Sequence, residues 1–169
     1  MSERGAALTQ VRGLAFWLGV SLAVVALDQL TKWAMMRALH PGDERVVSPF
    51  FSLVLTFNTG AAFSFLRDAG AWTRYLFSAL AIAVACLVVW LLRRGGNAWY
   101  CTGLALILGG GIGNLCDRVT LGHVVDFLLF HWDRWYYPAF NLADSAITVG
   151  AALLILDSLR RSGKGRAAA

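Results

Sequence analysis

The chain has 169 residues, of which 58% are hydrophobic and only 15% are charged. Soluble domains average about 45–50% apolar and about 25% charged residues, so this composition excludes an ordinary soluble domain and favours an integral membrane protein. The formal net charge is +5, but the basic residues flank apolar runs, which fits lipid headgroups better than nucleic acid. We expect one membrane domain over residues 1–169.

Four apolar stretches are long enough to cross a bilayer as helices. A helix rises about 1.5 Å per residue and a bilayer core is about 30 Å thick, so about 20 residues are needed. The first stretch is not a secretory signal peptide, because its apolar part continues past Asp28 and Lys32. In the third, Gly109 and Gly113 form a GxxxG pattern typical of close helix packing. The predicted fold is an all-α bundle of four transmembrane helices, over about 14–36, 72–92, 99–115 and 140–159.

The basic residues predict the orientation of the bundle. Cytoplasmic segments of membrane proteins carry an excess of Lys and Arg, so the side that carries these residues in short segments is assigned to the cytoplasm. Both termini are therefore expected there, and the segments 37–71 and 116–139 are expected outside the cytoplasm. The basic residues concerned are Arg4, Arg12, Arg93, Arg94, Arg160, Arg161, Lys164 and Arg166.

The two outer segments have the pattern of a small sheet. Residues 50–57 (FFSLVLTF) are aromatic and aliphatic and precede Asn58-Thr59-Gly60, which predicts a strand followed by a turn. The run 61–66 is apolar but too short to span, so we expect it to rest at the membrane interface. Residues 123–130 (HVVDFLLF) are also strand-like, with Asp126 in the middle.

Polar residues from distant segments fall at the outer ends of the predicted spans or in the outer segments. A carboxylate at membrane depth is costly unless it is paired, solvated or protonated, so its presence there indicates function. Since the predicted topology brings these groups to one level near the outer interface, it predicts an active site at that level. They are Asp28, Lys32, Asn58, Asn114, Asp117, Arg118, Asp126 and Asp144.

Two carboxylates could supply the chemistry. If Asp126 and Asp144 lie close together, they cannot both ionise easily, and one keeps its proton. The acid could then polarise a peptide carbonyl while the carboxylate takes a proton from water, which needs neither metal nor cofactor. The apolar neighbourhood of Asp126 predicts a raised pKa, whereas the first turns of a helix favour a negative charge on Asp144. From the residues alone, catalytic and structural roles both remain open.

The sequence also allows a comparison of this chemistry with other mechanisms and other protein classes. The cysteines Cys86, Cys101 and Cys116 form no CxxC pair, and no HExxH motif occurs, which disfavours a redox pair or a zinc peptidase. A dyad of Ser145 with Lys32 remains open. So do a small proton- or ion-coupled transporter that uses the carboxylates and a non-catalytic scaffold, although polar groups gathered at one face do not line a path across the membrane.

Five sequence blocks resemble the signature blocks of bacterial lipoprotein signal peptidase, also called signal peptidase II. They occur in the order of that family and, together with the four spans, extend the resemblance over nearly the whole chain. The blocks are 28–32 (DQLTK), 58–63 (NTGAAF), 109–118 (GGGIGNLCDR), 124–127 (VVDF) and 140–145 (FNLADS).

The resemblance implies an intramembrane aspartic endopeptidase of the bacterial cytoplasmic (inner) membrane, with its active site near the extracytoplasmic face. It would remove the signal peptide from diacylglyceryl-modified prolipoproteins by cleaving just before the lipidated cysteine. The implied catalytic dyad is Asp126 and Asp144, without metal or cofactor. A small external sheet and a short interfacial helix would complete the fold, and the implied partners are these substrates and membrane lipids, with the chain a monomer. The implied supporting residues are Asp28, Lys32, Asn58, Gly60, Asn114, Arg118 and Asn141.

Several of these positions also have a structural explanation. Asp28 and Lys32 are four residues apart in the favourable order for a helical ion pair, which is the role we favour for them. Asn141 could cap the fourth helix. Asp117 could either cap the end of the third helix or act in catalysis, and Arg118 beside it could form an interfacial ion pair with it. For Arg118 and the asparagines, structural support and substrate contact both remain open.

Overall fold

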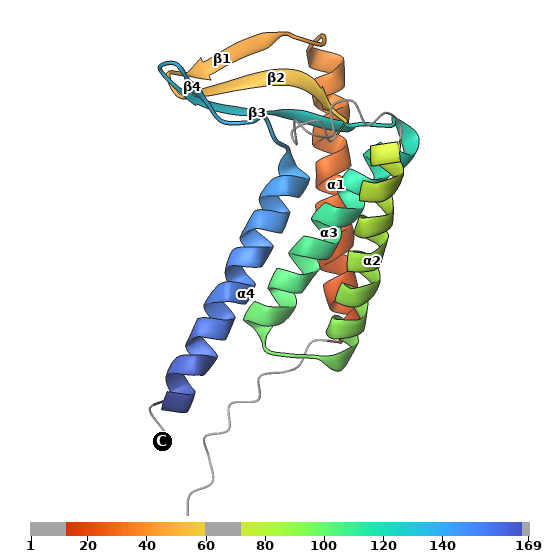
Figure 1. Cartoon of the computed structure of the whole chain (residues 1–169), viewed down its shortest axis with the longest axis vertical. Helices are drawn as coiled ribbons and strands as arrows, with labels where there is room; N and C mark the ends of the chain where they lie inside the picture. The colour runs from red at the N-terminus through yellow and green to blue at the C-terminus, as the bar shows by residue number, and fades with distance from the viewer. Residues whose placement is uncertain (1–12, 60–71, 167–169) are drawn as a thin grey trace, which may run out of the picture.

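The computed structural model describes residues 13–59 and 72–166, with side chains as far as Arg161. Its helices are α1 (Leu14–Ala38), α2 (Trp72–Arg94), α3 (Ala98–Thr120) and α4 (Leu142–Arg166), which form a bundle with a sheet across one end (Figure 1). Within these described residues, all four helices are long and apolar enough to cross a membrane. The predicted fold class is therefore confirmed.

The third helix runs five residues further than the apolar stretch suggested. Asn97 caps its start, because its side-chain Oδ1 accepts a hydrogen bond from the Tyr100 N–H at 3.0 Å. At the other end Gly122 has φ +86, in the left-handed region, and its N–H donates to the Asp117 carbonyl at 3.2 Å. Asp117 therefore lies within α3, and its buried carboxylate pairs with the Lys32 ammonium of α1.

Close contacts place α3 at the centre of the bundle, where it packs against each of the other three helices. A methyl group added at Gly109 would lie 2.7 Å from the Ser21 carbonyl oxygen of α1, and one at Gly113 would lie 2.6 Å from Asp28 Oδ2. The predicted role of this glycine pair in close packing is thus confirmed. The buried apolar core lies toward the end away from the sheet and comprises Trp17, Val88, Leu92, Cys101, Leu104, Ala105 and Leu108.

The sheet consists of antiparallel strands in the order β1-β2-β3-β4. The two predicted strands are present, as β2 (Phe51–Asn58) and β3 (Val124–Trp132). The edge strands β1 (Glu44–Ser48) and β4 (Trp135–Tyr136) were not predicted, because both are short and largely exposed and show no alternation of buried and exposed residues. The expected interfacial segment 61–66 and Gly60 lie outside the described residues.

Candidate active site

Backbone pairing brings the two candidate aspartates together. Asp126 is on β3, opposite Thr56 of β2. Two residues further along β3, Leu128 pairs with Phe140, and hydrogen bonds of 2.8 Å and 3.0 Å join their backbones in both directions. Because α4 starts two residues after Phe140, this bridge fixes Asp144, in the first turn of α4, beside the strand that carries Asp126.

Asn141 donates hydrogen bonds to both carboxylates, to one from its side chain and to the other from its backbone. Its Nδ2 donates to Asp126 Oδ1 at 2.7 Å. Its side-chain Oδ1 accepts from the Asp144 N–H at 2.9 Å, while its own backbone N–H donates to Asp144 Oδ2 at 3.2 Å. The last two bonds form a reciprocal cap at the start of α4, so the predicted N-cap role of Asn141 is confirmed. The same residue therefore starts the helix and connects the two acids.

Asp126 is almost completely buried, with 1% of its surface exposed. Burial, followed by the negative charge of Asp144, raises the pKa of Asp126 to about 7. Hydrogen bonds from Asn58 Nδ2 to Oδ2, at 3.1 Å, and from Asn141 oppose this rise without cancelling it. The raised pKa predicted for Asp126 is confirmed, so this carboxyl keeps its proton to a higher pH than an ordinary aspartate does.

Asp144 has different surroundings. It is half-buried, and Asn114 of α3 donates to its Oδ1 through Nδ2 at 2.7 Å. It also lies in the first turn of α4, where the helix dipole stabilises negative charge. The two acids thus occupy unequal environments: one is sequestered on a strand, and the other is hydrogen-bonded at a helix terminus.

A buried ionic cluster lies next to this pair. The Lys32 ammonium is 2.8 Å from Asp28 Oδ2 and 2.8 Å from Asp117 Oδ2, and it donates to Asn114 Oδ1 at 3.0 Å. All three of its N–H groups therefore have acceptors. The predicted ion pair between Asp28 and Lys32 is confirmed. The suggested pairing of Asp117 with Arg118 is wrong, because in the described part of the chain Asp117 pairs with Lys32 across the helix interface.

Asp28 and Asp117 of the cluster each accept a backbone hydrogen bond from the residue that precedes one of the two candidate acids. Asp28 Oδ1 accepts from the Ala143 N–H of α4 at 2.9 Å, and Asp117 Oδ2 accepts from the Val125 N–H of β3 at 3.1 Å. Gln29, which the sequence analysis did not single out, donates to Asp117 Oδ1 at 2.8 Å. Its position inside the 28–32 block was the signal that could have identified it.

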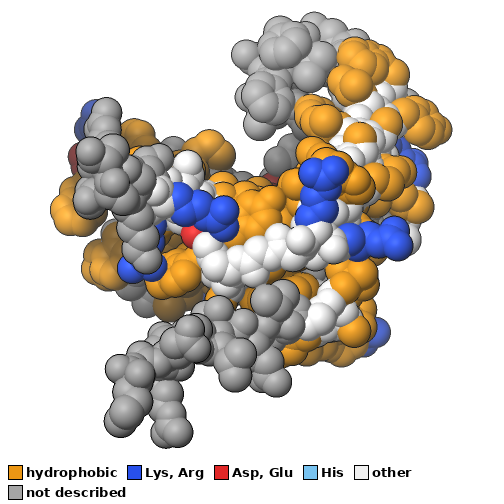
Figure 2. Space-filling view, turned by 90° about the horizontal axis from the view of Figure 1, so that it is seen from below, with side chains coloured by type: hydrophobic (Ala, Val, Ile, Leu, Met, Phe, Trp, Pro, Cys, Tyr) orange, Lys and Arg blue, Asp and Glu red, His pale blue; other side chains and the backbone are white. Residues whose placement is uncertain are grey.

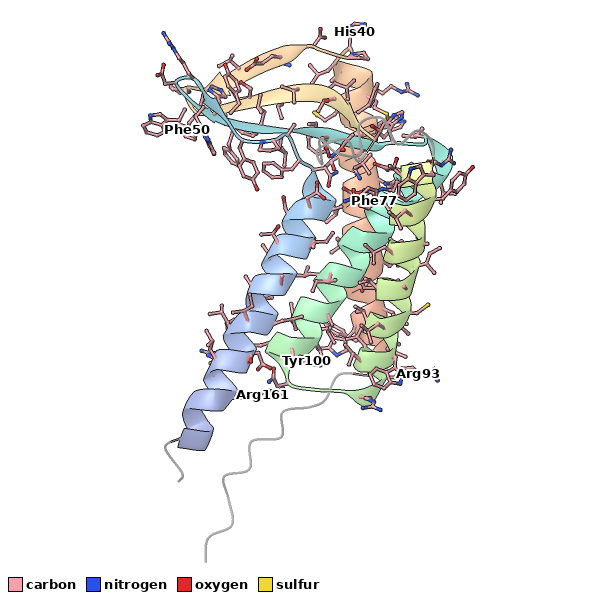
Figure 3. The ribbon with its side chains drawn as sticks, viewed as in Figure 1. His40, Phe50, Phe77, Arg93, Tyr100 and Arg161 are labelled. Carbon is pink, nitrogen blue, oxygen red and sulfur yellow. The ribbon has the colours of Figure 1, made fainter. Side chains whose placement is uncertain are left out.

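Arg118 lies near the pair but makes different contacts. Its Nη1 donates to the Asn114 carbonyl at 3.3 Å, and its guanidinium carbon is 5.4 Å from the centre of the Phe77 ring. Phe77 lies at the sheet end of α2 (Figure 3). Arg118, Asn114 and Asp144 form the polar end of a cavity of about 280 Å³ between α2, α3 and α4, whose other walls are mostly apolar.

A second groove reaches Asp144 from the other side. It has a volume of about 540 Å³ and lies between the sheet and α4, with aromatic side chains along one wall and Ser145 near Asp144. Ser145 Oγ donates to the Asn141 carbonyl at 3.0 Å, whereas Lys32 is bound in the ionic cluster. The two residues therefore have different partners and do not form the dyad that the sequence left open. Asp144 is the acidic residue common to both hollows.

The structure thus collects all but one of the predicted site residues at the sheet end of the bundle. The centre of this group is the pair Asp126 and Asp144, which accept hydrogen bonds from Asn58, Asn114 and Asn141. The ionic cluster around Lys32 lies next to the pair and is connected to it through Asn114. The exception is Gly60, which is outside the described residues. Within residues 13–59 and 72–161, no three His, Cys, Asp or Glu side chains are grouped as metal ligands.

The chain as a whole is similar to several known proteins. A family model described as signal peptidase (SPase) II matches residues 20–160. A protein of Paraburkholderia phymatum named lipoprotein signal peptidase is 56% identical over 149 residues, which are 88% of this chain and 90% of that protein. A protein of Burkholderia mallei with the same name is 54% identical over 149 residues, which are again 88% of this chain and 90% of that protein. A solved structure of a bacterial membrane enzyme superposes with a TM-score of 0.78 at 27% identity, covering 89% of this chain and 91% of that one.

Proposed function

This chain belongs to the signal peptidase II family, and on that premise we propose that it removes signal peptides from diacylglyceryl-modified prolipoproteins with Asp126 and Asp144 as an aspartyl dyad. The observation that carries this proposal is that one residue, Asn141, donates to both carboxyl groups, through its side-chain amide to Asp126 and through its backbone N–H to Asp144. Of the two acids, Asp126 is buried with a pKa of about 7, so it is the one that holds a proton near neutral pH. Two carboxyl groups in unequal states are what acid and base catalysis on one peptide bond requires.

The proposed reaction divides the proton transfers between the two groups. Asp144, as a carboxylate, takes a proton from water while the water oxygen bonds to the scissile carbonyl carbon. Asp126 gives its proton to the carbonyl oxygen, which would otherwise become an oxyanion. When the tetrahedral intermediate collapses, one of its hydroxyl groups returns a proton to Asp126, the C–N bond breaks, and Asp144 protonates the leaving amine. Both groups then regain their starting states.

The surrounding amides fix this geometry without adding charge. Asn114 and Asn141 are neutral donors, so they hold the carboxyl groups in place and leave the proton to move between the acids and the substrate. Catalytic groups act efficiently when their rotamers are held by neighbouring hydrogen bonds. The supporting roles proposed for these asparagines and for Asn58 follow from this.

The two hollows beside Asp144 suit a substrate with two apolar parts. The cavity between α2, α3 and α4 would take the signal peptide, and the groove under the sheet would take the diacylglyceryl group. Apolar grooves with a few polar groups at the reacting centre are typical of such binding sites. We assign the bond just before the lipidated cysteine to the position beside Asp144, because Asp144 lines both hollows.

The proposed orientation follows the positive-inside rule. Arg93, Arg94, Arg160 and Arg161 lie at the end of the bundle away from the sheet, so that end and both termini are assigned to the cytoplasm. The dyad is then near the extracytoplasmic face, at a depth that a lipid-anchored scissile bond can reach. Membership of the family does not favour the transporter alternative.

Cleavage of a purified diacylglyceryl-prolipoprotein in detergent tests the proposal. Wild type should cleave it with a metal chelator present, whereas Asp126→Asn and Asp144→Asn, each shown to be folded, should be inactive because either change removes one half of the proton transfer. Asp43→Asn is the matched control, since Asp43 is an exposed aspartate immediately before β1. Substantial turnover by either folded dyad variant would refute the assignment.

A further inference from the structure

A separate groove lies at the other end of the bundle. It is formed where the first turns of α3 face the middle of α4, and its volume is about 260 Å³. It is lined by Ala98, Trp99, Thr102 and Leu153. Apart from the Thr102 hydroxyl and the indole N–H, these side chains are apolar. Because both helices span the membrane, this groove opens toward the lipid chains and has no part in the site at the sheet end.

A cation lies at the mouth of this groove. The guanidinium carbon of Arg160 is 4.5 Å from the centre of the Trp99 ring, which forms one wall. Arg160 is exposed, and it is two helical turns beyond Leu153 on α4. A long basic side chain at a helix end carries its charge toward the headgroups while its stem covers apolar surface. The groove therefore combines an apolar channel with a positive charge at headgroup level.

Among the residues with described side chains, no acidic group forms an ion pair with Arg160. Asp157 accepts from Arg161 Nε at 2.9 Å and from Asn97, so it neutralises Arg161. Arg161 also lies near Tyr100 at the start of α3 (Figure 3), with its guanidinium carbon 5.6 Å from the ring centre. Among the described residues, the ion pair between Asp157 and Arg161 is the one found at this end of the bundle. Arg160 instead contacts the aromatic ring of Trp99. Seen from below, Lys and Arg side chains gather on this face among hydrophobic ones (Figure 2).

We propose that this groove binds one anionic glycerophospholipid, with an acyl chain along Trp99 and Leu153 and the phosphate at Arg160. Basic pockets between transmembrane helices on the cytoplasmic side are suited to acidic headgroups, and each basic residue near the surface strengthens such binding. The apolar lining selects a lipid chain over a soluble anion, and the Arg160 guanidinium selects an acidic headgroup over a zwitterionic one. The bound lipid fills the space between α3 and α4 at the end opposite to the catalytic site.

Quenching of Trp99 by a brominated acyl chain measures occupancy directly. The full-length protein is placed in nanodiscs of phosphatidylcholine that contain a small fraction of phosphatidylglycerol brominated on one chain, and then in the reverse mixture. The Trp99 signal is the difference between wild type and Trp99→Phe, a variant that keeps an aromatic ring under Arg160. We expect brominated phosphatidylglycerol to quench Trp99 about fivefold more effectively than its share of the lipid predicts, because one basic residue at the surface contributes about this factor.

The chain offers a closely matched control. Arg94 lies over the Trp90 ring at 3.7 Å, at the same end of the bundle, but Trp90 is not among the residues that line the groove. Arg160→Gln should abolish the preference for phosphatidylglycerol at Trp99, and Arg94→Gln should leave it unchanged. Equal quenching by the two lipids in wild type, or an equal loss in both variants, would overturn the proposal. Quenching that disappears as the protein-to-lipid ratio rises would also overturn it and identify a second copy of the chain as the occupant.

Discussion

Asp126→Asn should abolish cleavage and yet stabilise the folded protein at neutral and alkaline pH. The pKa of Asp126 is about 7 in the folded protein, against 3.8 for an ordinary aspartate. Between these values the unfolded chain has lost this proton and the folded protein keeps it, so the free energy of unfolding falls as the pH rises from about 4 to about 7. Each unit of pKa difference corresponds to about 1.4 kcal/mol, which makes the total fall about 4 kcal/mol.

An amide at this position does not titrate, so Asp126→Asn removes that contribution. The free energies of unfolding of variant and wild type, measured by denaturant titration in mild-detergent micelles, should diverge across this pH range by about 4 kcal/mol in favour of the variant. A change in hydrogen bonding to Asn58 or Asn141 would add only a constant offset. Asp144→Asn should show a smaller pH dependence than wild type, because it removes the second cause of the raised pKa. A difference between Asp126→Asn and wild type that is flat from pH 4 to pH 8 would refute the reasoning.

Three further changes test the surroundings of the pair. Asn58→Ala removes a hydrogen-bond donor that favours the ionised form of Asp126, so the pKa of Asp126 should rise. The loss of activity on the alkaline side of the pH-rate profile should therefore move to higher pH, and no movement or a movement to lower pH would contradict this. Lys32→Met should lower the free energy of unfolding by about 3–5 kcal/mol, because it leaves the buried carboxylates of Asp28 and Asp117 without their cation. Adding Asp117→Asn to this variant should restore part of the lost stability, whereas additive losses would argue against the ion pair. Gly110→Ala should cost about 1–3 kcal/mol, since its methyl would press on α4, whereas Gly111→Ala, with nothing within 4 Å, should be neutral by the same unfolding assay.

The local features of the site could be predicted because each depends on a short stretch of chain. An asparagine three residues before an aspartate at the start of an apolar run has the pattern of a reciprocal helix cap, and Asn141 with Asp144 forms one. Asp28 and Lys32 are one helical turn apart, so their pairing follows from helix geometry alone. The burial of Asp126 follows from the apolar strand around it.

The contacts between helices could not be predicted in the same way. The bond of Lys32 to Asp117 depends on how α1 and α3 are rotated and shifted against each other, which no local pattern determines. Hydropathy placed the end of the third span at 115, since charged residues follow, but a charge that is paired across a helix interface does not end a helix. The edge strands were missed because backbone pairing with a stronger neighbour, and not their own composition, makes them strands.

The protonation of Asp126 depends on how the positive charge of Lys32 is balanced. Lys32 lowers the pKa of Asp126, but its effect is smaller than those of burial, of the charge of Asp144 and of the hydrogen bonds from Asn58 and Asn141. Its ammonium is held by Asp28 and Asp117, and only the neutral amide of Asn114 extends from it toward the pair. A lysine free to bind Asp126 would keep it ionised and remove the acid that the reaction needs. We infer a role for the second carboxylate of the cluster, that of Asp117. Together with Asp28 it occupies the Lys32 ammonium, so that the charged cluster can support the proposed dyad without neutralising it.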